Sequence, residues 1–499
     1  MGFISTRSTK CVIGIDVGSQ GAKAVLVGHD GECLASARKP YSPTVVGSVR
    51  VEQDPSVWVS ALRELVPELT AKAGAGPTDV SHLALACQVD GIVPVDSKGE
   101  PLRPAMIWMD RRASKQTDFL DEVAGSDAVF MRTGLNLDPS HGAPKMMWLL
   151  ENEPEVCRQA ERFLPVGSFL VSWLTGEVAQ DYANASSSML FDLRTKDWDG
   201  CLLGHSGIEK SLLPPVLPAE TVAGELKPDR ASELGLASSC RVLVGTADEH
   251  AAVIAGKAET GSTIIDVSGT AEVVSMVTDR LELDDERLVE THFDADPTHF
   301  LLENPGFASG GSVLWLSQLL GCSQPDVFEL AEGQAAGNGG LTFIPALNGS
   351  VTPRWNPRMG GAFFPLDLSH GAGALSRAVL EGCAFALRDV VDRLRSMSPA
   401  ASEIVALGGG SRSSLWLQMK ADVTGMPVRA VMDHSPSACG AAAIALVAAG
   451  VHPDTATAMA MISAGPDASF EPDPGSAEAY EESYGRYRSM FDALEPILR

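Results

Sequence analysis

The sequence has few basic residues for its length. Its 38 lysines and arginines stand against 64 aspartates and glutamates, which gives a formal net charge of −26, and no basic cluster stands out beyond the pair Arg111–Arg112. A chain with a large net negative charge repels the phosphates of duplex nucleic acid and of anionic lipids. We therefore expect neither nucleic acid nor a membrane surface as a partner. An anionic ligand would need local hydrogen-bond donors or metal ions.

Paired cysteines and long apolar runs are also missing. The nine cysteines are scattered and none forms a CxxC pair, so neither a zinc site nor a disulfide framework is indicated. The longest apolar run, Ala438–Val451, is shorter than the roughly 20 residues of a membrane span and is predicted to be a buried helix. The first ten residues lack the apolar core of a signal peptide. A reduced, cytoplasmic location is expected.

Short apolar runs alternate with helical patterns along the 499 residues, a length that favours more than one domain. The runs end in glycine or polar residues, as buried strands do, and the mixture indicates an α/β fold. The predicted strands are Val12–Ile15, Ala24–Val27, His82–Cys87, Arg241–Thr246, Ser262–Gly269 and Glu403–Gly410, and the predicted helices are Pro55–Thr70, Gly311–Leu320, Ser376–Met397 and Ser413–Thr424.

Two segments resemble each other. "IDVGSQGAKAVLV" (Ile15–Val27) and "IDVSGTAEVVSMV" (Ile265–Val277) share Ile-Asp-Val, a turn of small residues and a second apolar run. One copy lies near the start of the chain and the other just past its middle. This placement suggests two related halves with a boundary near Gly256–Gly261.

The turn after Asp16 is rich in small residues. In Rossmann and Walker loops such a turn leads into a helix, but here β-branched residues follow and predict a strand. A β-hairpin turn can still bind phosphate through a nest of backbone N–H groups. A tight turn without a ligand remains the alternative.

Two further segments follow an apolar run, one with charged residues and the other with glycines. Asp248, Glu249 and His250 follow the run at 241–246, where acids at a strand's carboxyl end reach a ligand, although Asp248 could equally cap a helix. Gly408–Gly410 follow the run at 403–407 and precede the serine-rich start of a helix. Because glycine has no side chain, these residues either leave room for a flat ring to approach the backbone or form a plain turn.

Taken together and in this order, the segments resemble the FGGY carbohydrate kinases, the family of xylulokinase, ribulokinase and glycerol kinase within the actin/hexokinase-like superfamily. The resemblance runs from Cys11 to about Gly450. The similar stretches are "GIDVGSQGAKAVLV" (first phosphate loop), Leu85–Ala113 (sugar region), Phe163–Asp199, "GTADEHAA" (catalytic segment), "DVSGTAEV" (second phosphate loop) and Gly408–Val428 (adenosine side).

This resemblance implies two ribonuclease-H-like domains with an interdomain cleft, at residues 11–256 (sugar-binding) and 257–499 (nucleotide-binding). It implies ATP and Mg²⁺ as cofactors, a small sugar or polyol as substrate, and the possibility of a homodimer. Xylulose is the default substrate. Ribulose, glycerol or erythritol, a non-catalytic member that only binds nucleotide or sugar, and an actin- or chaperone-like ATPase are the alternatives.

By the same resemblance Asp248 is the general base that takes a proton from the sugar hydroxyl, and Asp16 and Asp248 hold Mg²⁺. An alcohol is a poor nucleophile, so a carboxylate within hydrogen-bond reach suits this chemistry. The expected nucleotide contacts are Gly18, Ser19, Gln20, Lys23, Gly269, Thr270, Gly310, Gly409, Gly410 and Ser413, and the expected sugar contacts are Gln88, Asp90, Trp108, Asp110, Arg111 and Glu249.

The sequence departs from the family pattern at three places. Glu249 stands where an asparagine usually follows the catalytic aspartate, and its charge is expected either to raise the pKa of Asp248 or to shift the set of substrates. Asp90 takes the place of a histidine common in xylulokinases, and "IWMDRRA" (Ile107–Ala113) is nearer the ribulokinase form. Gly349-Ser350-Val351 replaces a common Gly-Glu-Arg. The substrate therefore stays open between ketopentoses and polyols.

Overall fold

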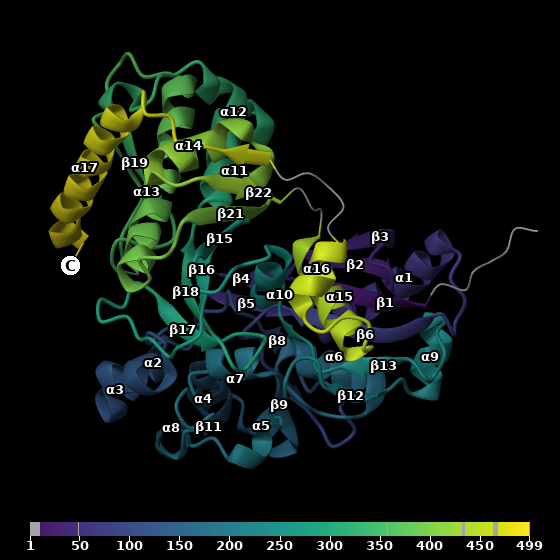
Figure 1. Ribbon diagram of the computed structural model, residues 1–499. Helices are drawn as coiled ribbons and strands as arrows, with labels where there is room; N and C mark the ends of the chain where they lie inside the picture. Colours follow the sequence, from purple (N-terminus) through teal and green to yellow (C-terminus); the bar gives the residue numbers. More distant parts are fainter. Residues whose placement is uncertain (1–9, 48, 357, 432–434, 463–467, 499) are drawn as a thin grey trace, which may run out of the picture. The chain divides into compact units, whose positions relative to one another are not determined.

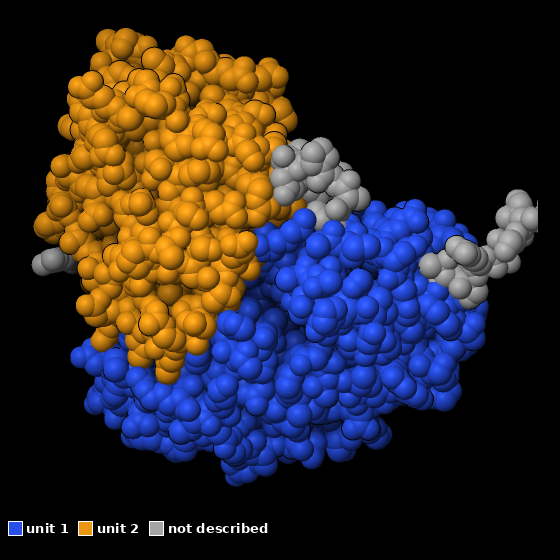
Figure 2. All heavy atoms as spheres, viewed as in Figure 1, with its two compact units in different colours: residues 1–257, 292–300, 435–464 blue, residues 258–291, 301–434, 465–499 orange. Residues whose placement is uncertain are grey.

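The computed structural model describes residues 10–47, 49–356, 358–431, 435–462 and 468–498. The chain forms two compact units, shown in different colours in Figure 2. Unit 1 comprises residues 1–257, 292–300 and 435–464, and unit 2 comprises residues 258–291, 301–434 and 465–499. Each unit is thus assembled from segments that are distant in the sequence. The division into continuous domains at 256/257 stays a prediction.

Unit 1 is built around a mixed sheet with strand order β12-β13-β6-β1-β2-β3, in which β14 also pairs with β6. β1 and β2 form an antiparallel hairpin, and β1 runs parallel to β6. The strands are β1 (Cys11–Val17), β2 (Gly21–Gly28), β3 (Cys33–Pro40), β6 (Val80–Cys87), β12 (Val222–Glu225), β13 (Arg241–Leu243) and β14 (Thr246–Ala247).

Two long helices pack against this sheet (Figure 1). Helix α1 (Pro55–Ala73) buries its apolar stripe against β2 and β3, and α15 (Pro436–Ala448) lies over β1 and β6. The backbone of α15 approaches β1 so closely that a Cβ on Gly14 would lie 2.0 Å from the carbonyl oxygen of Ala438. Small residues on both elements therefore allow this contact, which brings a segment from the end of the sequence into unit 1.

Shorter elements complete unit 1. They include α10 (Asp248–Ala255), which begins directly after β14 and packs against α15. The others are β4 (Thr44–Val46), β5 (Arg50–Gln53), β7 (Val93–Val95), β8 (Ala105–Met106), α2 (Ser114–Ala124), α3 (Ser126–Thr133), α4 (Gly142–Asn152), α5 (Pro154–Gln159), β9 (Arg162–Leu164), α6 (Val166–Thr175), α7 (Tyr182–Ser187), β10 (Phe191–Asp192), β11 (Asp197–Trp198), α8 (Gly200–Ser206), α9 (Pro228–Leu234) and α16 (Thr455–Ile462).

Unit 2 is built around a second sheet, with strand order β17-β18-β16-β15-β21-β22-β23. β15 and β16 form an antiparallel hairpin and β15 runs parallel to β21, which repeats the arrangement of β1, β2 and β6. The strands are β15 (Thr263–Ser268), β16 (Glu272–Thr278), β17 (Glu290–Phe293), β18 (Phe300–Phe307), β21 (Glu403–Gly408), β22 (Val428–Ala430) and β23 (Ala468–Phe470). The last two residues of β17 and the first residue of β18 are counted with unit 1.

The core of unit 2 is formed around α13 (Ala372–Met397), whose middle is buried on nearly all sides. Helix α14 (Ser414–Thr424) packs against it, and Trp416 lies fully inside this core. The remaining elements are α11 (Gly310–Leu320), α12 (Gln324–Glu332), β19 (Thr342–Ile344), β20 (Ala362–Phe364) and α17 (Ala477–Leu494).

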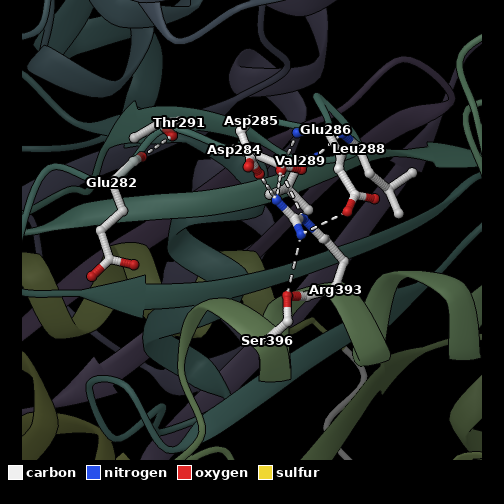
Figure 3. A network of polar contacts seen from close by, with 9 residues as sticks. All are labelled: Glu282, Asp284, Asp285, Glu286, Leu288, Val289, Thr291, Arg393 and Ser396. Carbon is white, nitrogen blue, oxygen red and sulfur yellow. Dashed lines mark hydrogen bonds and ion pairs between the residues drawn. The ribbon is translucent and has the colours of Figure 1, made fainter.

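A polar network fixes the loop before β17 to α13 (Figure 3). The buried Asp284 carboxylate accepts hydrogen bonds from the backbone N–H groups of Leu288 (2.8 Å) and Val289 (3.0 Å) and from Arg393 Nε (2.7 Å). The guanidinium of Arg393 also pairs with the exposed Asp285. Asp284 thus satisfies backbone donors that would otherwise be buried without partners.

These elements confirm most of the predictions from the sequence. The two-domain α/β class, the two hairpins, the buried helix at 438–448 and the four long helices are all present, within a few residues of the predicted ends. The single strand predicted at Arg241–Thr246 is wrong. Gly245 has φ +76° and a Cβ there would lie 2.3 Å from the carbonyl oxygen of Leu85, so the chain kinks and the strand divides into β13 and β14.

All nine cysteines are free thiols. Among the described residues no helix is both long and apolar enough to cross a membrane.

Candidate active site

Two acidic residues of unit 1 flank the end of one strand. β1 and β14 both pair in parallel with β6, where Val17 and Ala247 lie opposite Cys87. Asp16 precedes Val17, and Asp248 follows Ala247 as the first residue of α10. The cap residue of that helix is Ala247, so Asp248 is not the helix cap that the sequence also allowed. The fold brings both carboxylates to the carboxyl end of the sheet, where ligands bind in α/β proteins.

Burial and nearby charges shift the pKa values of both carboxylates. Burial raises the pKa of Asp248 well above its usual range, and the negative charges of Glu249 and Asp16 raise it further. The charge of Glu249 thus acts on the pKa of Asp248 in the predicted direction, and its effect on the substrate stays a prediction. Burial also raises the pKa of Asp16, and Lys23 Nζ, 3.5 Å from Asp16 Oδ2, opposes that rise. The pKa of the Cys87 thiol is raised by burial and then by both aspartates, as expected for a residue between them.

The turn Gly18–Gln20 is held through its carbonyl groups. The Tyr41 hydroxyl donates to the Gly18 carbonyl (2.9 Å), Gln53 Nε2 donates to the Ser19 carbonyl (2.8 Å), and the Tyr41 N–H donates to the Gln20 carbonyl (3.3 Å). In a trans peptide the N–H points opposite to the C=O. The N–H groups that follow these carbonyls therefore point away from Tyr41 and Gln53.

Gln88 and Asp90 lie in the loop after β6. Gln88 Nε2 donates to Gln53 Oε1 (2.9 Å), and its buried Oε1 has no hydrogen-bond partner in the described part of the chain. Asp90 adopts a positive φ of 55°, a backbone conformation that needs support from its surroundings. His141 Nδ1 lies 3.2 Å from Asp90 Oδ2, and Lys145 Nζ donates to the Asp90 carbonyl (2.7 Å).

The other predicted sugar contacts differ in how accessible they are. Asp110 is fully buried and accepts hydrogen bonds from the Val51 N–H (2.8 Å) and from Arg112 Nε (2.9 Å), so its carboxylate is already used inside the protein. Arg111 pairs with Asp138 Oδ2 (2.7 Å). Trp108 is about one-third exposed, and the Glu249 carboxylate lies 3.5 Å from His250 Nδ1.

Unit 2 contains the remaining predicted residues, on three loops. Gly269 and Thr270 form the turn between β15 and β16, where the Gly269 N–H donates to the Ala271 carbonyl (2.8 Å) and the Thr270 carbonyl accepts from Gly311 N–H (2.9 Å). A Cβ on Gly310 would lie 2.3 Å from the Gly269 carbonyl oxygen, so only glycine fits there. Gly409 and Gly410 follow β21, and Ser413 caps α14 by accepting from the Trp416 N–H (3.3 Å).

Sequence reasoning missed the residues that support these loops. Tyr41, Gln53, His141 and Lys145 all lie far along the chain from the residues that they contact. Lys145 is completely buried, and burial lowers its pKa to about 8 against the opposing charges of Asp90, Asp110 and Asp138. In the sequence, the position of Lys145 within an apolar helical pattern could have indicated a buried lysine.

Two family models match nearly the whole chain. The N-terminal domain of the FGGY family of carbohydrate kinases matches residues 11–255, and the C-terminal domain of the same family matches residues 266–449.

Full-length relatives agree with these matches. The chain is 29% identical over 489 residues to a xylulose kinase of Escherichia coli (strain K12) and 30% identical over 491 residues to a xylulose kinase of Klebsiella pneumoniae, in each case over 97% of this chain and 99% of the relative. A glycerol kinase of Trichlorobacter lovleyi is 30% identical over 458 residues, 89% of this chain and 91% of the relative.

Solved structures show the same fold. A ligand-bound xylulose kinase from Lactobacillus acidophilus is 25% identical with a TM-score of 0.89, and a gluconate kinase from the same organism is 25% identical with a TM-score of 0.90. Each comparison covers 97% of this chain and 98% of the other.

Proposed function

The chain belongs to the FGGY family of carbohydrate kinases, and we propose that it transfers the γ-phosphoryl group of ATP to a hydroxyl of a neutral ketopentose, with xylulose as the substrate to test first. Relatives similar to it over about nine-tenths or more of their length include xylulose kinases of three bacteria. In this proposal unit 1 binds the sugar and unit 2 binds the nucleotide. A homodimer and a cytoplasmic location remain predictions.

One observation carries the proposal: Asp248 begins a helix at the carboxyl end of the unit 1 sheet, in a surrounding that raises its pKa. A general base works best when its pKa approaches the working pH, because it then takes up a proton readily. Asp248 would accept the proton of the attacking sugar hydroxyl as the oxygen–phosphorus bond forms. A carboxylate in this role contributes on the order of 10²–10⁴-fold to the rate.

The turn Gly18–Gln20 is suited to anionic oxygens. Its carbonyls are bound by Tyr41 and Gln53, so the N–H groups of Ser19, Gln20 and Gly21 each point away from the group that binds the preceding carbonyl. Successive N–H groups that point the same way attract phosphate. Lys23 adds a positive charge next to the turn. We propose that this turn guides the transferred phosphoryl group.

The two aspartates fit a magnesium ion that arrives with the nucleotide. Within the described ranges no three His, Cys, Asp or Glu side chains are grouped so that they could hold a metal ion on their own. Mg²⁺ is usually bound by one or two carboxylates together with substrate phosphates and waters, and Asp16 and Asp248 supply two such carboxylates. The ion would neutralise charge on the phosphates, and the same charge would lower the raised pKa of Asp248.

The charges around the sugar region favour a neutral substrate. Asp90, Asp248 and Glu249 contribute carboxylates, whereas the nearby Arg111 is already paired with Asp138. Sugar hydroxyls can donate to these carboxylates and to the Gln88 Oε1, which is buried and has no hydrogen-bond partner in the described residues. A sugar acid such as gluconate would place another carboxylate among them. We therefore expect gluconate to be a poor substrate, although a gluconate kinase shares the fold.

A substrate panel tests the proposal. The purified full-length chain is incubated with Mg-ATP and either xylulose, ribulose, glycerol, erythritol or gluconate, and ADP release is followed with a sugar-free control. We expect sugar-dependent ADP release, with a ketopentose giving the highest kcat/KM and gluconate the lowest. Binding of nucleotide and sugar without ADP release would make the chain a non-catalytic member of the family, and ADP release that does not depend on sugar would make it an ATPase.

A further inference from the structure

A cluster of polar side chains is buried beneath the loops of unit 2 that are proposed to bind ATP. It contains one ammonium group, Lys420 on α14, and two carboxylates, Asp266 on β15 and Glu272 on β16. The side chains of these three residues are at most 1% exposed. The hydroxyls of Ser268 and Ser309 complete the cluster.

Within the cluster the ammonium group makes two hydrogen bonds and one further ion pair. Lys420 Nζ donates to Asp266 Oδ2 (2.6 Å) and to Ser268 Oγ (2.6 Å), and it forms an ion pair with Glu272 Oε1 (3.1 Å). The Ser268 hydroxyl in turn donates to Asp266 Oδ1 (2.9 Å). The Ser309 hydroxyl donates to the second oxygen of Glu272, Oε2. Both hydrogen bonds and the ion pair of the ammonium group are thus made to residues of this cluster.

The ammonium group is held in its charged form by its neighbours. Burial alone would lower the pKa of Lys420, but the charges of Asp266 and Glu272 outweigh it and the pKa is raised. Burial and the charge of Asp266 raise the pKa of Glu272 to about 7, while Lys420 and Ser309 oppose that rise. Burial, together with the charge of Glu272, raises the pKa of the Cys383 thiol on α13 to about 12, while the charge of Lys420 opposes that rise. Without Lys420 the two carboxylates would lack the positive charge that compensates their burial.

The cluster joins the three loops at their bases. Ser268 immediately precedes Gly269 and Thr270, and Ser309 immediately precedes Gly310. The third loop, at 408–410, lies against the first: a Cβ on Gly408 would lie 2.7 Å from the Ser268 carbonyl oxygen, and one on Gly410 would lie 2.5 Å from Ser268 Cβ. Lys420 comes from the helix that follows this third loop. The ammonium group therefore contacts Ser268 directly and is linked to Ser309 through Glu272, while the third loop packs on Ser268.

The internal repeat shows that this arrangement differs from its counterpart in unit 1. The Ile-Asp-Val motif places Asp16 in β1 and Asp266 in β15 at equivalent positions of the two hairpins. Asp16 pairs with Lys23, whose side chain is 46% exposed, whereas Asp266 pairs with a lysine that is 1% exposed. The lysine partner of Asp16 therefore reaches solvent, whereas the lysine partner of Asp266 is enclosed within unit 2.

We propose that Lys420 is a positioning residue for the nucleotide: its ammonium group fixes the bases of the loops at 268–270, 309–311 and 408–410 in the arrangement that binds ATP. The proposal rests on the kinase function proposed above. It deepens that function because Lys420 itself lies beneath the loops and acts on the nucleotide through Ser268, Glu272 and Ser309. Loss of the cluster should weaken nucleotide binding and leave sugar binding, which we assign to unit 1, nearly unchanged.

Binding of Mg-ADP to the full-length chain, measured by isothermal titration calorimetry, tests the proposal, together with KM for ATP and for the sugar. Ser309→Ala removes a single hydroxyl group. Ser317→Ala in α11, the helix that begins directly after Ser309, is its matched control, since the Ser317 hydroxyl donates to the Leu314 carbonyl of its own helix. We expect S309A to raise Kd and KM for the nucleotide about tenfold, because a hydrogen bond to a charged group is lost. We expect S317A to match the wild type.

Lys420→Met should have a larger effect on the nucleotide, with KM for the sugar within about twofold of wild type. The exposed Lys115→Met is its control. If K420M does not fold, S309A decides. The proposal is overturned if folded K420M or S309A binds Mg-ADP as tightly as the wild type, or if KM for the sugar rises as much as KM for ATP. Failure of the wild type to bind Mg-ADP would instead contradict the proposed function.

Discussion

Asp248 and Glu249 are adjacent carboxylates at the start of α10, and the negative charge of Glu249 adds to burial in raising the pKa of Asp248. A base with a raised pKa is protonated at low pH and gains activity as the pH rises through that pKa. The chain therefore carries an unusual residue at a position that tunes its proposed base. This relationship leads to the first prediction.

Glu249→Gln should move the acidic limb of the pH profile of kcat/KM to lower pH. The substitution removes a negative charge beside Asp248, so the proton on Asp248 is held less tightly and the base becomes available at lower pH. The profile is measured with saturating Mg-ATP and limiting sugar. An acidic limb at the same pH in both proteins would show that Glu249 does not affect the base.

Lys145→Met should weaken sugar binding. Lys145 donates to the Asp90 carbonyl from a fully buried position and supports the positive φ of that residue. We expect KM for the sugar to rise about tenfold, as for other charge-assisted hydrogen bonds, with KM for ATP within about twofold. K115M is again the control. An equal rise of both KM values would point to general damage.

Glu272→Gln should change how stability depends on pH. The pKa of Glu272 is raised to about 7 in the folded chain, above its value in the unfolded chain, so the folded state favours the protonated form. This stabilisation is complete below the unfolded pKa and is lost as the pH rises through about 7. Glutamine resembles the protonated acid at every pH. The Tm of E272Q should therefore match wild type at acidic pH and exceed it in mildly alkaline buffer, and a constant difference across this range would refute the assignment.

Asp284→Ala should destabilise unit 2. Asp284 is buried and accepts from two backbone N–H groups and from Arg393, so its loss leaves buried donors without partners (Figure 3). We expect the free energy of unfolding, measured in urea, to fall by about 2–3 kcal/mol. Asp285→Ala provides a matched control, since Asp285 pairs with the same arginine from a position that is 90% exposed. Its effect should stay within about 0.5 kcal/mol, and equal effects of both variants would contradict the network.

Local patterns predicted the features that depend on neighbouring residues. The two hairpins follow from a turn of small residues between apolar runs, and the position of Asp248 after a strand follows from the run that precedes it. Gly245 was visible in that run, but its break in the strand depends on the Leu85 carbonyl of another strand.

Contacts between distant segments could not be predicted. The partners Lys420 and Asp266 are 154 residues apart. The alanine-rich α15 is apolar on all sides, so its sequence does not indicate that it packs on the sheet of unit 1. The partner of Asp110, in contrast, could have been predicted, because Arg112 lies only two residues later in the sequence and donates to its carboxylate.

The role of Asp248 is the central claim, and Asp248→Asn tests it most directly. The sugar phosphate formed from xylulose and Mg-ATP is measured by ³¹P NMR for the wild type, D248N and the exposed control Asp118→Asn, and Mg-ADP binding is measured for the same proteins. We predict that D248N loses on the order of 10²–10⁴-fold in rate and still binds Mg-ADP, while D118N matches the wild type. Sugar phosphate formation by D248N at the wild-type rate would contradict the account.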